Sequence, residues 1–359
     1  MVDRICRCLR EPDLQRRVGR ILLLALLIAA VAYAWFAVTG ARTPTRLVVY
    51  AFSTQEEVLA QTIFPAFEQA WEDETGLELS IEGVFGPSAT LAGQIVLGAP
   101  ADVALLSNAQ HVTYLKVGRL VGPETRPVIV GYTPMVIVTR RGNPAGIAEF
   151  ADLGLGNAEA GADPALTLIH ANPLSSGAGQ WAVLAEYGSA LFASGDPAAA
   201  EAQLRAIWSN VRVLGSSARA TMTLFELGAG DACVTYEQDA LLARDRGVDL
   251  EIVVPSRTVV AQHVAVIVHE NVRGSERLAA QAFVDYLLSD AGQQAFERYH
   301  LRPAAFESQR FPQVLHPFTA EDLGGWQQAY AELIETLWQT QVVPRLDLEL
   351  APGLQGLGE

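Results

Sequence analysis

The sequence predicts an α/β protein with mainly parallel sheets arranged in two lobes. Apolar, strand-like runs alternate with amphipathic, helix-like runs along most of the chain, and this order is typical of α/β architecture. Half of the residues are apolar, which is enough to build a sizeable core. The chain has 359 residues, a length that suits about two domains of ordinary size.

The N-terminal region predicts export from the cytoplasm. Six arginines precede an uncharged apolar run over residues 21–41, and about 20 apolar residues span a bilayer. Because arginines stay on the cytoplasmic side, we expect residues 1–20 to be cytoplasmic and residues 21–41 to form a single-pass transmembrane anchor. The remaining chain would then lie outside the cytoplasm, in the periplasm or at the cell surface. A cleaved signal peptide is the alternative, because Ala32–Ala34 and the VTGA stretch ending at Ala41 both resemble cleavage sites.

The composition excludes several classes of partner. Without the six arginines and three acidic residues of the first 20 positions, 19 basic and 37 acidic residues remain, and such an acidic chain repels nucleic acid and anionic lipid. The cysteines Cys6, Cys8 and Cys233 are too few for a disulfide framework. The histidines do not pair at ligand spacing with one another or with a cysteine. We therefore expect no nucleic-acid partner, no metal and no other cofactor.

The strand and helix runs follow one another in a regular order. The first strand run, residues 47–52, precedes a helical run, residues 63–76, in which Phe64, Phe67 and Trp71 fall on one face. Further strand–helix pairs are residues 101–107 with 109–118, 135–140 with 147–154, 166–171 with 179–192, and 231–237 with 238–247. The order ends with a strand over residues 264–269, a helical stretch over residues 275–299 and a loose tail over residues 346–359.

The ends of the predicted strands indicate where a ligand binds. We expect residues 45–128 and 258–345 to form lobe I and residues 129–257 to form lobe II. In open α/β sheets, ligands bind outside the carboxyl ends of the strands. A fifth strand ends in Tyr236, and four further strand ends carry loops rich in small or hydroxyl-bearing residues, namely residues 52–54, 86–90, 175–179 and 215–221.

The loop with the sequence LSSGAG favours an anion as the ligand. Ser176 offers a hydroxyl there, and Gly177 and Ala178 offer main-chain N–H groups in the first turn of a helix, where the helix dipole is positive. Ser88 precedes a second helical run in the same way. The alternative for each serine is a helix cap that binds no ligand.

The charges of these loops favour sulfate over phosphate. The loops contain no lysine, and Arg219 is their one guanidinium, which lies either in the site, beside it or in a structural ion pair. They also contain no carboxylate, and alternation along the strand points Glu237 away from the face that Tyr236 uses. Phosphate keeps a proton near neutral pH and needs an acceptor for it, whereas a fully ionised oxyanion needs donors only.

Several stretches resemble the sulfate/thiosulfate-binding proteins of ABC importers, over nearly all of the region from Leu47 to Trp338. The most specific are NPLSSGAGQW, residues 172–181, and SSARAT, residues 216–221. The resemblance implies a two-lobed, type II periplasmic-binding-protein-like fold with a hinge, in which uncharged donors hold a dehydrated oxyanion between the lobes. The stretch GAPADV, residues 98–103, is instead typical of the related molybdate-binding proteins.

The same resemblance implies roles for individual residues. Ser88 and Ser176 match positions that bind the anion through hydroxyls in the sulfate family. Gly177, Ala178 and Ala218 match positions that bind it through main-chain N–H groups.

Two further positions depart from the family pattern. The first loop matches only with a shift of one residue, so either Ser53 or Thr54 would supply its donor, unless both merely cap a helix. Tyr236 stands where the sulfate family usually has a tryptophan. Its hydroxyl is able to donate, and the arrangement resembles that of molybdate binders, although a half-buried structural tyrosine is the alternative.

These observations predict the solute-binding component of an ABC importer, which binds sulfate or thiosulfate and delivers it to a membrane permease. A molybdate- or tungstate-binding protein is the main alternative, and a membrane-tethered anion sensor on the same fold is another. A serine hydrolase that uses Ser175 or Ser176 is disfavoured, because no GxSxG motif surrounds them and no loop histidine has an adjacent acid. We therefore expect no enzymatic activity.

Overall fold

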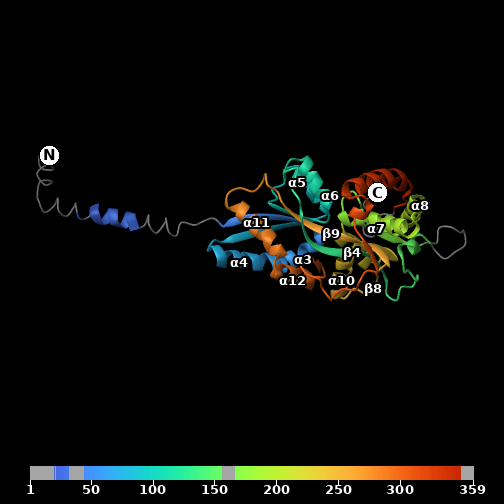
Figure 1. Ribbon diagram of the computed structural model, residues 1–359. Helices are drawn as coiled ribbons and strands as arrows, with labels where there is room; N and C mark the ends of the chain where they lie inside the picture. The colour runs from blue at the N-terminus through green and yellow to red at the C-terminus, as the bar shows by residue number, and fades with distance from the viewer. Residues whose placement is uncertain (1–19, 21, 32–43, 156–165, 349–359) are drawn as a thin grey trace, which may run out of the picture. The chain divides into compact units, whose positions relative to one another are not determined.

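The computed structural model describes residues 20, 22–31, 44–155 and 166–348 (Figure 1). The chain divides into two compact units, Met1–Pro44 and Thr45–Glu359. In the first unit, residues 22–31 are helical and exposed. No helix among the described residues is long and apolar enough to cross a membrane. The rest of the predicted cytoplasmic segment and anchor, and residues 349–359 of the predicted tail, lie outside the described residues.

The second unit is built on a mixed sheet, so the prediction of mainly parallel sheets is wrong. The main path through the sheet runs β2-β1-β3-β9-β4-β7-β5-β6, with β10 and β8 beside β4 and β11 beside β9. The strands are β1 (Thr45–Phe52), β2 (Leu79–Gly86), β3 (Val103–Leu106), β4 (Val128–Arg140), β5 (Leu168–Ala171), β6 (Val211–Gly215), β7 (Ala232–Tyr236), β8 (Leu250–Val253), β9 (Arg257–Ile267), β10 (Arg302–Pro303) and β11 (His316–Phe318).

Two long strands account for the mixed orientation. Parallel pairs join β1 to β2 and β3, and join β5 to β6 and β7. In contrast, β4 is antiparallel to β7, β8, β9 and β10, and β9 is antiparallel to β3. Strands β8 and β9 pair with successive parts of β4, and only residues 254–256 separate them. Because the chain does not reverse between β8 and β9, both strands lie antiparallel to β4.

Most predicted helices are present, with two differences. The α-helices are α3 (Glu56–Val58), α4 (Phe64–Thr75), α5 (Ser88–Val96), α6 (Ala109–Val117), α7 (Gly177–Ser194), α8 (Pro197–Trp208), α9 (Ala218–Glu226), α10 (Glu237–Asp245), α11 (Ser275–Leu288), α12 (Asp290–Arg298) and α13 (Trp326–Ala329), which continues as a π-helix, η5 (Tyr330–Val342). The helix expected over residues 147–154 is a short 3₁₀ turn, η3 (Phe150–Gly154). The stretch expected over residues 275–299 is interrupted at Ser289, whose extended backbone ends α11 and whose hydroxyl caps α12.

Helices cover both faces of the strands near β1. The predicted apolar face of α4 is confirmed, because Phe64, Phe67 and Trp71 are buried, and α4 ends at Gly76, which has a left-handed φ of 66°. This face packs with α11 and α12 on one side of β1, and α5 and α6 pack on the other side. Strands buried on both faces read as continuous apolar runs, as β1 does. The loops that follow such strands are consequently held by two packed layers.

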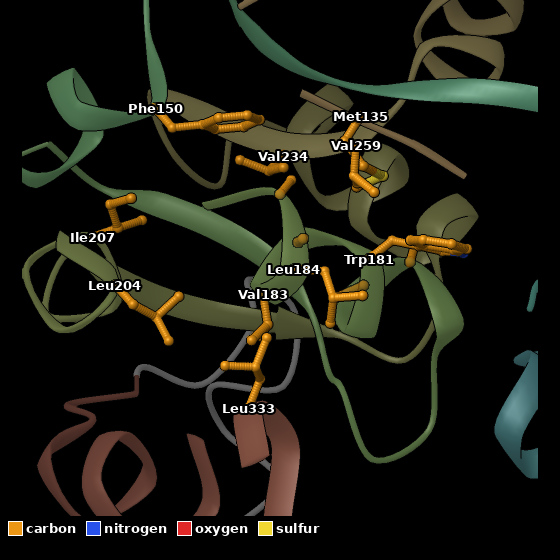
Figure 2. Packing of buried hydrophobic residues seen from close by; sticks show 14 of the residues in the cluster. Met135, Phe150, Trp181, Val183, Leu184, Leu204, Ile207, Val234, Val259 and Leu333 are labelled. Carbon is orange, nitrogen blue, oxygen red and sulfur yellow. The ribbon is translucent and has the colours of Figure 1, made fainter. Parts of the chain in front are cut away.

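Helix α7 runs through the centre of the other large core. Trp181, Val183 and Leu184 of α7 pack among side chains from the sheet, from α8 and from the C-terminal π-helix, where Leu333 approaches Val183 (Figure 2). Twelve residues of α7 are buried, distributed around its whole circumference. The start of α7 is thereby fixed in position, which matters because the loop rich in serine and glycine leads into it.

Candidate anion-binding site

The strand-end loops enclose one small polar pocket. Its cavity volume is only about 10 Å³, far below the roughly 300 to 1,000 Å³ of pockets for drug-sized ligands. All eight predicted binding residues line the pocket, together with Phe52, Gly86, Pro87, Ser107 and Ser217; the eight are Ser53, Thr54, Ser88, Ser176, Gly177, Ala178, Ala218 and Tyr236. None of these lining residues carries a formal charge. The pocket thus suits a small ion or molecule that is bound by dipoles.

Four α-helices begin at this pocket. Ser88 is the first residue of α5, Ser176 and Ser217 are the N-caps of α7 and α9, and Tyr236 is the N-cap of α10. Helix N-termini carry partial positive charge and unpaired N–H groups. The first turns of α5, α7 and α9 contain no acidic residue that would neutralise this charge. The convergence favours an anionic occupant.

The start of α7 offers both a hydroxyl and a main-chain donor. The Ser176 hydroxyl accepts a hydrogen bond from Ala178 N–H at 3.2 Å, so it caps the helix, as the alternative interpretation proposed. A hydroxyl has two acceptor sites and one proton, and the proton of Ser176 is still free to donate. The N–H of Gly177 has no acceptor among the described residues. Capping and ligand binding are therefore compatible at Ser176.

Gly177 is required at its position by close packing. A Cβ atom on Gly177 would lie 1.6 Å from Ser107 Oγ and 2.8 Å from Ser107 Cβ. The carbonyl oxygen of Ser107 accepts hydrogen bonds from Trp181 Nε1 at 2.9 Å and from His263 Nδ1 at 3.1 Å. Since these two bonds hold Ser107 in place, only glycine lets the start of α7 approach it.

The first turn of α5 contributes less than the sequence suggested. Ala89 N–H and Thr90 N–H donate to the carbonyl oxygen of Ser175, at 3.0 and 3.3 Å. These two first-turn donors are therefore used to tie two pocket loops together. What α5 presents to the pocket is Ser88, whose hydroxyl oxygen lies 2.9 Å from Ser107 N and 2.8 Å from His111 Nδ1.

The structure separates the two candidates in the first loop. The Thr54 hydroxyl donates to Asp239 Oδ2 at 2.8 Å, so its proton is not available to an anion in the pocket. The side chain of Ser53 has no hydrogen-bond partner among the described residues and is half-buried. Ser53 is accordingly the better hydroxyl donor of the two.

Two hydroxyls at the pocket are buried without a hydrogen bond of normal geometry to the described residues. They belong to Tyr236, which is 1% exposed, and to Ser107, which is also 1% exposed. Burial raises the pKa of Tyr236 well above its ordinary value, so the hydroxyl stays protonated and remains a donor. The side chains of Ser107 and Tyr236 also interact with each other. One hydroxyl can donate to the other, and the pair still has a proton to offer an occupant.

Arg219 lies beside the pocket and does not line it. Its guanidinium bonds both carboxylate oxygens of Glu57, at 2.7 and 2.5 Å, and its Nε lies 3.9 Å from Asp239 Oδ1. Arg219 therefore forms a structural ion pair beside the site and does not lie within it. Glu237 likewise faces away from the pocket, where it accepts two hydrogen bonds from Arg302 at 2.8 Å each.

Sequence reasoning missed Ser107 and Ser217. Ser217 lies in the loop of residues 215–221, which the sequence predicts to be a candidate binding loop. Ser217 is the N-cap of α9, and its side-chain oxygen accepts a hydrogen bond from Ala220 N–H at 3.1 Å. Ser107 follows β3 directly, so a hydroxyl at the end of a predicted strand was the available signal. The sequence could not show that Ser107 touches Gly177, because 70 positions separate them.

The buried carboxyl of Asp239 predicts a pH-dependent stability. Burial raises its pKa to about 6, although Arg219 and the Thr54 hydroxyl oppose the shift. Between about pH 4 and pH 6 the folded state keeps a proton that the unfolded state loses, so stability falls as the pH rises through this window, by on the order of 3 kcal/mol. Asp239→Asn keeps an acceptor for Thr54 and does not titrate. In denaturant unfolding from pH 4 to pH 7, the free energy of unfolding of the variant should rise relative to that of the unaltered protein as the pH increases. If the two proteins changed in parallel with pH, the raised pKa of Asp239 would be refuted.

Comparisons with known proteins agree with this fold. The family described as bacterial extracellular solute-binding protein matches residues 47–302. The chain therefore belongs to the bacterial extracellular solute-binding proteins, in the group that contains the sulfate-binding protein of Escherichia coli. That protein is 32% identical to this chain over 283 residues, which cover 74% of this chain and 83% of the relative.

Two further similarities extend this placement. The thiosulfate-binding protein of Pseudomonas aeruginosa is 29% identical over 279 residues, covering 73% of this chain and 81% of the relative. The solved structure of the sulfate-binding protein SubI from Mycobacterium tuberculosis superposes with a TM-score of 0.70 at 23% identity, covering 81% of this chain and 99% of that one. At this identity the structural similarity shows the fold alone, and it agrees with the predicted periplasmic-binding-protein-like architecture.

Proposed function

We propose that this protein binds sulfate or thiosulfate outside the cytoplasm and delivers it to an ABC permease. The observation that carries the proposal is a small pocket of uncharged residues at the starts of four helices, with free N–H and hydroxyl protons. Hydrogen bonds to a charged acceptor are worth roughly 1.5 to 3 kcal/mol each, so several of them bind a dianion without a countercharge. The sulfate- and thiosulfate-binding relatives support the choice of ligand.

The lining of the pocket favours sulfate over phosphate. The nearby carboxylates of Glu57, Glu237 and Asp239 are bonded to Arg219, Arg302 and Thr54, and none of the three lines the pocket. A protonated phosphate would therefore find no carboxylate to accept its hydrogen. Sulfate and thiosulfate are fully ionised near neutral pH and need only donors.

Binding without catalysis is the better account of the serines at this site. The Ser175 hydroxyl donates to the carbonyl of Ser216 at 2.9 Å, and the Ser176 hydroxyl caps α7. Neither is hydrogen-bonded to a histidine, so neither has the activating base that a serine nucleophile needs.

We propose a hinged, two-lobed movement for capture and release. Lobe I would comprise residues 45–128 and 258–345, and lobe II residues 129–257. Ser53, Ser88 and Ser107 would then belong to lobe I, while the donors of α7, α9 and Tyr236 would belong to lobe II. An anion bound by both sets would favour the closed form, which would be the form that docks on the permease.

We also propose that the apolar segment at residues 21–41 directs the chain across the membrane and anchors it there. The arginines before it and its length support this proposal. A mass measurement on the mature protein from the membrane fraction tests it: an intact N-terminus supports the anchor, and a mass that lacks the first 34 or 41 residues supports the cleaved signal.

Calorimetric titration tests the choice of ligand. Sulfate, thiosulfate, molybdate and phosphate are titrated separately into the purified protein at neutral pH. We expect sulfate or thiosulfate to bind at least about 100-fold more tightly than phosphate, because the phosphate proton lacks an acceptor. Tighter binding of molybdate than of sulfate would reverse the assignment in favour of the molybdate alternative. If phosphate bound more tightly than sulfate, the proton on phosphate could not be what disfavours it in this pocket.

A further inference from the structure

The hydroxyl of Ser88 sits between two groups that compete for its proton and lone pairs. Its oxygen lies 2.9 Å from the main-chain nitrogen of Ser107 and 2.8 Å from His111 Nδ1. Ser88 is 2% exposed and His111 is fully buried. Ser88 is also part of the pocket lining, whereas His111 lies behind it and is not part of the lining.

The direction of the Ser88 proton depends on where His111 carries its own. A main-chain N–H can only donate, so Ser107 occupies one lone pair of the Ser88 oxygen. If His111 has its proton on Nδ1, it donates to the second lone pair, and the Ser88 proton is left to point into the pocket. If the proton is on Nε2, Ser88 must donate to Nδ1 and turns a lone pair to the pocket.

Only one of these two arrangements fits an anion. A lone pair of Ser88 directed at an anionic oxygen is repulsive, whereas an O–H directed at it is a charge-assisted hydrogen bond. Burial lowers the pKa of His111 to about 3, so at neutral pH the ring has a single N–H and cannot donate from both nitrogens.

The side chain of Gln180 is a second polar group that acts on the His111 ring. The side chain of Gln180 raises the affinity of the His111 ring for a proton, and its Oε1 already accepts from Asn108 Nδ2 at 2.9 Å. His111 Nε2 completes no hydrogen bond within the described residues. A proton on Nε2 is therefore not held there by a completed hydrogen bond to a described residue, so the ring proton can move to Nδ1 when an anion enters the pocket.

We propose that His111 is a positioning residue for the anion: in the complex its proton lies on Nδ1, where it donates to Ser88 and aims the Ser88 hydroxyl at the ligand. Anion binding shifts the ring proton from Nε2 to Nδ1. This inference rests on the proposed function, because it needs an anion in the pocket. It assigns a role to a residue that does not itself touch the ligand.

The tautomer is measured directly by NMR on the unaltered protein. With ¹⁵N-labelled histidine, the two ring nitrogens of His111 have distinct shifts for N–H and for a bare nitrogen. We expect the bare-nitrogen signal to move from Nδ1 to Nε2 as sulfate is added to saturation. A sulfate-saturated complex with the proton on Nε2 would overturn the inference while leaving the proposed function intact. A protein that binds none of the four anions would overturn both.

A double-mutant cycle separates positioning from structural support. We expect His111→Leu to weaken sulfate binding about tenfold with Ser88 present and less than about twofold in a Ser88→Ala background. His111→Gln, which offers an amide N–H, should recover part of the loss. Equal losses in both backgrounds would mean that His111 only supports the fold and would overturn the inference. If the leucine variant does not fold, the ring-nitrogen shifts alone decide.

Discussion

Replacing Gly177 by alanine is expected to weaken anion binding by at least about 100-fold. The new Cβ would lie 1.6 Å from Ser107 Oγ and 3.2 Å from Asn108 Nδ2, so the start of α7 and the loop after β3 must separate. Ser107 cannot yield freely, because Trp181 and His263 both donate to its carbonyl. Misplacing two donors costs at least about 3 kcal/mol, or a loss of about 100-fold in affinity. Calorimetry with sulfate measures the change.

A matched glycine in a neighbouring helix provides the control. Gly93 lies in α5, and a Cβ added there meets no atom within 4 Å. Gly93→Ala should bind sulfate as the unaltered protein does and be slightly more stable, since alanine favours helix over glycine. Unchanged affinity in the Gly177→Ala variant would mean that the ligand does not contact the start of α7.

Removing two hydroxyls together is expected to weaken binding by about 10²- to 10⁴-fold, because each bond to a charged acceptor is worth roughly 1.5 to 3 kcal/mol. The double variant is Ser176→Ala with Tyr236→Phe. The Tyr236 hydroxyl makes no hydrogen bond of normal geometry to the described residues, so its removal is expected to cost little stability. The loss of the Ser176 cap costs about 1 kcal/mol. The measurement is calorimetry with sulfate, accompanied by a denaturant unfolding curve.

The cap effect is controlled at a distant helix. Ser289 caps α12 by accepting from Gly292 N–H at 3.2 Å, the same distance as the Ser176 bond. Ser289→Ala should lose at least as much stability, because the Ser289 hydroxyl also donates to the carbonyl of Tyr286 at 2.7 Å, and it should keep its affinity for sulfate. Reversing an exposed charge, as in Glu72→Lys, should also leave affinity within about twofold because surface charges are screened. If the double variant kept its affinity, the anion would have to bind elsewhere.

Most strands, helices and pocket loops followed from local pattern, and the family resemblance added Ala218 and the choice of Ser53 or Thr54; all eight predicted residues line one pocket. The end of a strand and the small residues before a helix can be predicted from adjacent positions in the sequence. The α/β alternation then predicts that these strand ends lie close together. Strand direction is a different kind of property. The antiparallel setting of β4 and β9 depends on which strands pair across the sheet, and no local run of residues encodes that pairing.

The donor and acceptor roles within the pocket also required the three-dimensional arrangement. Thr54 and Ser53 are neighbours of the same chemical type, and only the position of Asp239 shows that the Thr54 hydroxyl is already used. Nothing in the sequence shows that the carbonyl of Ser175 accepts hydrogen bonds from the first-turn N–H groups of α5. His111, which bonds Ser88, carries no signal in the sequence, because only the packing of α6 against α5 brings its buried ring to Ser88.

Neutral dipoles alone are expected to bind a desolvated dianion in this pocket. Selenate is a heavier analogue of sulfate that anomalous scattering locates, and a crystal structure of its complex would show which groups bind the anion. We expect the anion within hydrogen-bonding distance of Ser88, Ser176 and the N–H of Gly177, with Arg219 still paired to Glu57. An anion that instead contacts the guanidinium of Arg219, or that lies outside the pocket, would contradict it.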